Sequence, residues 1–526
     1  MCSQFCANIN EDNSGCDFKE EELVGLPADF IGSLDRDSDG KFHVGLRAPH
    51  LLPVSQYATR QETRKALLEA KAKQCQQING PILERVLSLR QECAELLGYK
   101  NHAEYMLAPK MAARPGSVRD FHRGILEACG GVRAGDLDAL GKIKSQLYET
   151  PEKMVNPWDT AYLSRLHKED LGVDENVIRQ YFPMEHVIST VLDIYEELLC
   201  LSFRKLDNFI AWHPSVEAYA VVERSSDGVE STRGHFFLDL YPREGKYAHQ
   251  CVYPLRPSYV RACGEQVTPA CAIIGNLTKG VDGKPSLMRM REVETFFHEF
   301  GHVMHCVCSQ VDYVPFAWAW SAVPWPGGVQ QDFLEVPSMM LENFVYQPTL
   351  LKRLSKHHST AEELPDDIIQ KIVQARHVLS GYHYSRMIFL GEYDIIVHSG
   401  PAPYSYEGQE GLSAQQLYAI MCKHLTGVAC IEGTFPAASW FHLCMGYDAG
   451  YFGYLWSEVF AADLFAKFVV EDGDGVKEGR INEELGKRYR DTILTPCASE
   501  DGYTMLRNFL DREPSAAAFR EARGMA

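Results

Sequence analysis

The sequence is poor in basic residues and has no long apolar run. Its 52 Lys and Arg residues are outnumbered by 71 Asp and Glu residues, which gives a formal net charge of −19. Because an acidic surface repels polyanions, we expect the protein to bind neither nucleic acid nor an anionic membrane surface. No stretch approaches the roughly 18 consecutive apolar residues of a membrane-spanning helix.

The first twelve residues have neither the basic region nor the apolar region of a signal peptide. We therefore expect a cytoplasmic protein, and an organellar location stays open if a segment preceding this sequence carries a signal. The 16 cysteines include no Cys-x-x-Cys pair, so we expect reduced thiols in a reducing compartment. A hydrophobic share of 45% is normal for a globular protein with a sizeable core.

The sequence pattern changes twice along the chain. Residues 62–77 and 82–99 place apolar side chains at spacings of three and four, which is typical of amphipathic helices. Between about 211 and 290, β-branched and aromatic residues alternate with Gly and Pro, which indicates a small sheet. The helical pattern returns at Arg291 and continues to the end. We therefore predict a mainly α protein with a helical part over 1–210 and a second part over 211–526 that begins with the sheet.

A His-Glu-x-x-His spacing lies in the helical pattern that begins near residue 291. His298 and His302 are four residues apart, so both imidazoles lie on one helix face and can bind one metal ion. Glu299 lies about 100° around the helix, where it can address a water on the metal without binding the metal itself. His305 lies about 10.5 Å along the axis from His298, which is too far for the same ion, and we interpret it as structural.

A catalytic zinc site with two His ligands needs a carboxylate and an open fourth position. Glu335 and Glu342 follow in a second helical pattern and are seven residues apart, so they share a face. The spacing therefore leaves both of them open as the third ligand.

Four hydrogen-bonding rings, interleaved with three glycines, form a third candidate feature. They are His442, Tyr447, Tyr451 and Tyr454. Phenols and an imidazole on such a segment suit the stabilisation of a developing oxyanion. The alternative is a turn in which the aromatic rings only pack together.

Taken together, the zinc motif and two later segments closely resemble the thimet oligopeptidase and neurolysin family of zinc metallopeptidases. The resemblance covers nearly the whole chain. The segments that carry it are residues 292–305, 333–338 and 442–456, with further similarity in 25–30, 97–105 and 238–247.

The resemblance implies a mainly α, two-lobed zincin with a small sheet and a deep channel that admits short peptides. It also implies one Zn²⁺ per chain, held by His298, His302 and Glu335, with Glu299 as the general base. The expected reaction is the hydrolysis of internal bonds of short oligopeptides by a water at the zinc that Glu299 activates. We expect the chain to act as a monomer.

The same resemblance assigns roles to the four rings and to the remaining acid. His442 and Tyr451 are expected to donate hydrogen bonds to the transition state, and Tyr447 and Tyr454 are expected to contact the substrate. Glu342 is then a structural acid.

Three departures from the family keep an alternative open. The sequence lacks the helical segment that precedes residue 1 in the family, and Cys444 and Met445 replace smaller residues. An insert around 316–328 precedes Glu335 and holds three of the seven Trp residues. The alternative is therefore a catalytically impaired or inactive peptide-binding relative. An exopeptidase would need a fixed group to hold a terminal charge, and the sequence identifies none.

Overall fold

The computed structural model describes residues 1–525 except 226, 244–245, 247–249, 278–279, 281–284, 318–326, 472 and 474–476. Helices dominate these residues, whose strands form one five-stranded sheet and four small two-stranded ones. The predicted mainly α fold with a small sheet is therefore confirmed. Most of the predicted Trp-rich insert lies outside the described residues.

Ten helices precede the main sheet. The antiparallel pair of β1 (Gly15–Phe18) and β2 (Phe42–Gly45) interrupts them, with α2 between the two strands. The helices are α1 (Cys2–Glu11), α2 (Ala28–Gly32), α3 (Ala48–Tyr57), α4 (Gln61–Ala72), α5 (Gln76–Leu96), α6 (His102–Leu107), α7 (Pro115–Leu147), α8 (Thr160–Asp170), α9 (Glu175–Ile178) and α10 (Met184–Leu199).

The main sheet has the order β3-β4-β5-β9-β6, with β5 and β9 parallel and the other pairs antiparallel. It begins at residue 202, slightly before the predicted region. Its strands are β3 (Ser202–Lys205), β4 (Glu217–Arg224), β5 (Glu230–Asp239), β6 (Cys251–Arg256) and β9 (Ala270–Ile274), and β7 (Tyr259–Val260) pairs with β8 (Gln266–Val267).

A second set of helices follows the sheet. Two hairpins interrupt it, β10 (Tyr404–Tyr406) with β11 (Gln409–Leu412) and β12 (Val469–Glu471) with β13 (Lys477–Gly479). The helices are α11 (Met290–Cys308), α12 (Val336–Glu342), α13 (Pro348–Leu354), α14 (Asp366–Ala375), α15 (Ser380–His398), α16 (Ala414–Thr426), α17 (Gly453–Phe465), α18 (Glu483–Tyr489), α19 (Gly502–Leu510) and α20 (Ala517–Ala522).

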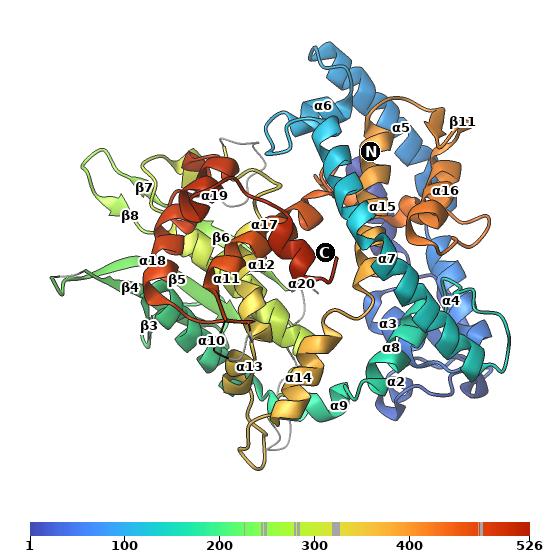
Figure 1. Ribbon diagram of the computed structural model, residues 1–526, viewed down its shortest axis with the longest axis horizontal. Coiled ribbons are helices and arrows are strands. Elements are labelled where there is room, and N and C mark those ends of the chain that lie inside the picture. The colour runs from blue at the N-terminus through green and yellow to red at the C-terminus, as the bar shows by residue number, and fades with distance from the viewer. Residues whose placement is uncertain are drawn as a thin grey trace.

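The chain passes between two halves of the molecule. In Figure 1, the sheet, α10 to α13, α18 and α19 lie towards the left, α14 and α20 lie near the middle, and most of the first helices lie on the right. Helices α15 and α16 also lie on the right, where α15 packs along α7. The predicted boundary near residue 210 and the predicted channel between lobes stay predictions.

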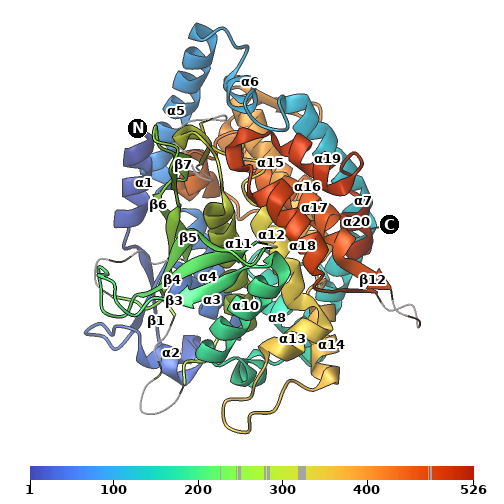
Figure 2. The ribbon, with the colours of Figure 1, turned by 90° about the vertical axis from the view of Figure 1, so that its left-hand side faces the viewer.

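Helix α11 is the central element of the largest hydrophobic core. It lies between the main sheet and α12, as Figure 2 shows. The ring of Phe300 meets that of Phe236 on β5 edge-on, with centroids 5.2 Å apart. Because both rings are fully buried, the sheet fixes one side of α11 and leaves the His298 side facing α12.

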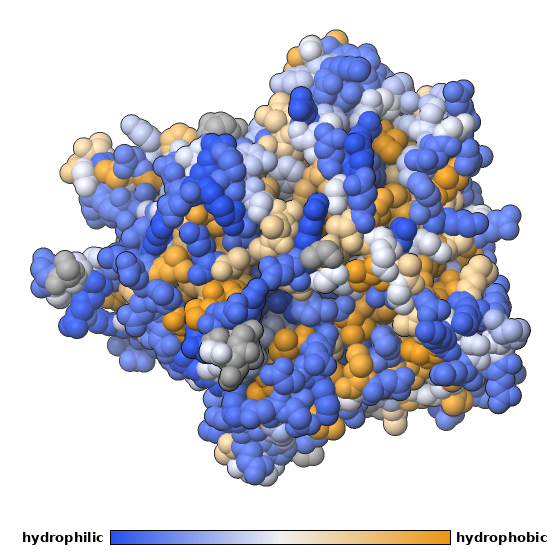
Figure 3. All heavy atoms as spheres, in the orientation of Figure 1, coloured by the Kyte–Doolittle hydropathy of each residue, from blue (hydrophilic) through white to orange (hydrophobic). Residues whose placement is uncertain are grey.

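Among the described residues, no helix combines the length and the apolar character needed to cross a bilayer. The face drawn in Figure 3 is mostly hydrophilic, with hydrophobic residues in small groups.

Candidate active site

The two histidines of the motif lie on one face of α11, where His298 is half-buried and His302 is buried. The helix begins where the backbone N–H of Arg289 donates to the Glu292 side chain at 2.8 Å, which satisfies a group near the helix end. Its opposite face is fully buried, and burying two imidazoles without polar partners there would cost free energy. The buried face consists of Val293, Phe296, Phe297, Phe300, Val303 and Met304.

His298, His302 and Glu335 come together as one cluster. A Glu335 carboxylate oxygen lies 3.1 Å from Nε2 of His302 and 3.3 Å from Nε2 of His298. Two donors about 2.1 Å from one tetrahedral ion are about 3.4 Å apart, so the observed spacing fits a shared metal ion. Within the described part of the chain, this is the one group of three or more His, Cys, Asp or Glu side chains placed to hold a metal.

Close approach of two helices brings Glu335 to the histidines. Glu335 directly precedes α12, and a Cβ added at Gly301 would lie 2.8 Å from the Cα atom of Ser338 on α12. Glycine at position 301 therefore lets α12 cross α11 next to His302. The Ser338 hydroxyl also donates to the Glu335 backbone carbonyl at 3.0 Å, which fixes the start of α12.

Glu342, at the other end of α12, reaches a different nitrogen. One of its carboxylate oxygens lies 3.0 Å from Nδ1 of His298. A carboxylate that accepts from Nδ1 orients the ring and leaves Nε2 free to bind a metal. The two acids that spacing alone could not separate thus take different positions, Glu335 between the two Nε2 atoms and Glu342 behind one ring.

The charges of the cluster are strongly coupled. Burial would lower the pKa of His298, but hydrogen bonds and charge from Glu335 and Glu342 outweigh it and raise that pKa well above its usual value. Burial would raise the pKa of the Glu335 carboxyl, but the two imidazoles hold it well below its usual range. Glu335 is therefore ionised across the working pH range, which is the state in which a carboxylate binds a cation.

Replacing Glu342 with Gln should weaken metal binding without abolishing it, because the amide oxygen can still accept from Nδ1 but carries no charge. We expect about 10- to 100-fold lower zinc affinity, the usual effect of losing a ligand's carboxylate partner. Competition with a chromogenic chelator measures it, and the exposed Glu363→Gln is the matched control. Equal affinities of the two variants would contradict the role of Glu342.

His305 is fully buried, and neither of its ring nitrogens has a hydrogen-bond partner in the described part of the chain. Burial, helped by the nearby His302, lowers its pKa to about 3. The folded protein therefore carries a neutral imidazole here, whereas an unfolded chain takes up a proton near pH 6.5. Unfolding free energy then falls by about 1.4 kcal/mol per pH unit as the pH decreases from about 6.5 to 3.

Substituting His305 with Leu should remove this acid sensitivity and an unpartnered buried polar group. We expect the unfolding free energy at pH 7 to rise by about 1 kcal/mol. Urea midpoints of the metal-free protein between pH 5 and pH 7 should depend less on pH than those of the parent. A destabilised variant with the parent's pH dependence would show that His305 makes a favourable interaction.

Glu299 lies beside the edge of the main sheet. Helix α11 contacts β6, and burial and then the charge of Glu299 raise the pKa of the Cys251 thiol on that strand. Cys251 belongs to β6, the strand at one edge of the sheet. Half-buried Glu299 therefore lies on the helix that packs against this edge strand.

The four predicted rings lie together around His442. Its ring centroid is 5.1 Å from that of Tyr451, 5.4 Å from that of Tyr447 and 5.9 Å from that of Tyr454. Tyr447 and Tyr454 stack with their planes 7° apart. The rings do pack, as the alternative interpretation expected.

The charge of Glu335 also influences two of the phenols. Burial is the main cause that raises the pKa of Tyr447 and of Tyr454, and the charge of Glu335 contributes to both. Tyr451 shares their ring cluster but responds to Asp394 and Arg386 rather than to Glu335. The ring segment is therefore electrostatically coupled to Glu335 through Tyr447 and Tyr454.

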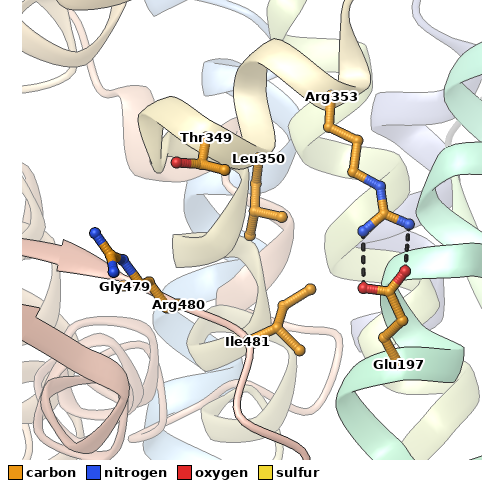
Figure 4. A pocket seen from close by; sticks show the side chains of 7 residues that line it. All are labelled: Glu197, Thr349, Leu350, Arg353, Gly479, Arg480 and Ile481. Carbon is orange, nitrogen blue, oxygen red and sulfur yellow. Dashed lines mark hydrogen bonds and ion pairs between the residues drawn. The ribbon is translucent and has the colours of Figure 1, made fainter.

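A cavity of about 410 Å³ lies elsewhere, between α10, α13 and the segment after β13 (Figure 4). Arg353 on its wall forms two hydrogen bonds with Glu197, at 2.8 and 2.5 Å. No predicted site residue lines this cavity. Its lining residues are Glu197, Thr349, Leu350, Arg353, Gly479, Arg480 and Ile481.

Comparison with known proteins identifies the family. The model of peptidase family M3 matches residues 54–525. The chain belongs to peptidase family M3. It is therefore a metallopeptidase, and the predicted resemblance is confirmed.

Relatives of this M3 peptidase extend over nearly its whole length. It is 34% identical to a thimet-like oligopeptidase of Dictyostelium discoideum, over 99% of this chain and 76% of the relative. It is 30% identical to saccharolysin of Saccharomyces cerevisiae, over 99% and 72%. A chloroplastic/mitochondrial organellar oligopeptidase A of Arabidopsis thaliana is 27% identical over 94% and 63%, so family membership does not decide between cytoplasm and organelle.

Sequence reasoning missed the contact of Glu342 with His298 and the polar groups behind the ring segment. Asp394 and Lys110 belong to this second set, and both are buried. No local pattern marks either residue, because their partners lie far away in the sequence.

Proposed function

We propose that this M3 peptidase is a zinc-dependent endopeptidase that hydrolyses internal bonds of short oligopeptides. The observation that carries the proposal is the convergence of His298, His302 and Glu335, whose ligand atoms lie within 4.8 Å of one another. Relatives that are named oligopeptidases support the substrate class.

Two imidazoles and one carboxylate are a typical donor set for a catalytic zinc that keeps a fourth position for water or substrate. We assign the ligand positions to His298, His302 and Glu335, with Glu342 orienting His298. When bound, zinc would supply a Lewis acid that lowers the pKa of water towards about 7 and polarises the scissile carbonyl.

Glu299 serves as the general base in this proposal. It follows His298 directly on α11, so its side chain points about 100° around the helix from that of His298. Glu299 is therefore not placed as a metal ligand. Its carboxylate accepts a proton from the attacking water and later passes it to the leaving amide nitrogen. The nearby β6 edge would hold the peptide backbone in an extended form.

The ring segment completes the proposed site. His442 and Tyr451 would donate hydrogen bonds to the developing oxyanion, and Tyr447 and Tyr454 would contact the substrate. The stacking of Tyr447 on Tyr454, within reach of Glu335, supports a fixed aromatic wall beside the metal ligands. Because Glu299 and all three ligand types are present, we propose an active enzyme rather than a peptide-binding relative.

A short, internally quenched peptide with both ends blocked tests the proposal. An endopeptidase should cleave it, a chelator should stop the cleavage, and added Zn²⁺ should restore it. Mass spectrometry then locates the cleaved bond. Cleavage only of peptides with a free terminus would indicate an exopeptidase, and full activity in chelator would contradict the metal mechanism.

A further inference from the structure

One buried carboxylate binds the backbone of the turn that carries Tyr451. Asp394 on α15 is fully buried and accepts three consecutive backbone N–H groups. Its oxygens lie 2.9 Å from the nitrogen of Ala449, 2.9 Å from that of Gly450 and 3.1 Å from that of Tyr451.

Three successive N–H groups that point at one spot form an anion-binding concavity. Here the anion is part of the protein, so these three amides cannot stabilise a substrate oxyanion. Ala449 also has a positive φ of 48°, which a residue with a side chain keeps only when its surroundings fix it. Interaction with the substrate is then left to the side chains of this segment, among them the Tyr451 phenol.

Other buried polar groups fix the same turn. The buried Lys110 ammonium donates to the carbonyl of Ala449 at 3.1 Å. A Cβ added at Gly450 would lie 2.9 Å from that ammonium nitrogen and 3.0 Å from the Gln331 side-chain oxygen. Gln331, which lies four residues before the proposed ligand Glu335, in turn donates to the carbonyl of Gly446 at 2.8 Å.

The Asp394 charge also reaches the two proposed oxyanion donors. Burial lowers the pKa of His442, and Asp394 opposes that effect. Burial raises the pKa of Tyr451, and Asp394 adds to the increase while Arg386 opposes it. The Asp394 charge therefore acts on both rings as well as on the backbone of the turn.

We propose that Asp394 is a positioning residue that holds the Tyr451 phenol where the oxyanion develops, by binding the backbone of the turn that carries it. The inference rests on the proposed function, in which Tyr451 donates a hydrogen bond to the transition state. Asp394 itself touches no substrate in this account.

Asp394→Asn keeps the shape of the side chain but offers only one acceptor oxygen to three amides. We expect kcat to fall about 10- to 100-fold, because a displacement of about 1 Å can cost that much. KM and zinc content should stay close to those of the parent, since only the transition state uses the lost interaction. Asp463→Asn is the matched control, because Asp463 on α17 is also almost fully buried and accepts the backbone N–H of Ser515 at 2.8 Å. Its kcat should not change.

A double-mutant cycle with Tyr451→Phe separates positioning from a general structural loss. Once the phenol is gone, Asp394→Asn should lower kcat by less than about threefold, because interacting sites are not additive. Independent effects of the two substitutions, or a loss of kcat that matches a loss of zinc, would overturn the proposal. So would a Tyr451→Phe variant with the parent's kcat.

A second variant keeps the test decisive if Asp394→Asn does not fold. Gly450→Ala leaves the carboxylate in place but pushes against Lys110 and Gln331, so it should give the same kcat loss, again masked by Tyr451→Phe. A kcat loss that Tyr451→Phe does not mask would overturn the proposal. Failure of the proposed function itself would be recognised differently, by full hydrolysis in Glu299→Gln.

Discussion

Glu299→Gln should retain one zinc per chain and lose nearly all hydrolysis of a quenched peptide. Gln has the shape of Glu but cannot accept the proton of the attacking water, and a general base typically contributes about 10² to 10⁴ in rate. The side chain is no ligand in our account, so zinc content, measured by elemental analysis, should not change.

A matched control lies on the same helix. Glu292 is in the first turn of α11 and only accepts the N–H of Arg289, so Glu292→Gln should cost helix-end stability and leave kcat unchanged. A Glu299→Gln enzyme with kcat within about tenfold of the parent would rule out the assigned base, since general bases usually contribute more.

Glu335→Gln should lose both zinc and activity. The carboxylate lies between the two Nε2 atoms and is ionised throughout the working range, so the neutral amide removes a ligand charge as well as a ligand. Losing a carboxylate that only hydrogen-bonds a metal ligand typically lowers affinity about 10- to 100-fold, and we expect zinc affinity to fall by more than that here. Chelator competition ranks the variants.

The expected order of affinity is Glu363→Gln above Glu342→Gln above Glu335→Gln. The reverse order for the last two would make Glu342 the third ligand, which is the alternative that the sequence left open. It would also mean that the contact between Glu335 and the two histidines changes when a metal binds.

The sequence was sufficient for the class of fold and for the metal motif. The periodicity predicted helices and the β-branched segments predicted a small sheet, because both patterns reflect local burial. The His298 and His302 spacing is also local, since one turn of helix sets it. The family resemblance then supplied the expected roles of Glu335 and of the ring segment.

Spacing could not separate Glu335 from Glu342, because a helical pattern places residues seven apart on one face. In the structure, Glu335 precedes α12 and Glu342 ends it. The crossing of α12 over α11 at Gly301 decides which acid meets the Nε2 atoms. That crossing is a tertiary contact, and no local pattern encodes it.

The polar groups behind the ring segment were unpredictable for the same reason. Asp394 lies on the buried face of α15, and its amide partners lie 55 to 57 residues further along the chain. A fully buried carboxylate is costly unless it is hydrogen-bonded, so the three amides explain why it is tolerated there. Only the folded structure shows the two together.

A crystal structure of the zinc-loaded protein, with anomalous scattering recorded at the zinc edge, tests the central claim most directly. We predict one strong peak about 2.0 to 2.2 Å from Nε2 of His298, Nε2 of His302 and a carboxylate oxygen of Glu335. A peak bound to other side chains, or a Glu335 carboxylate turned away from both imidazoles, would contradict it.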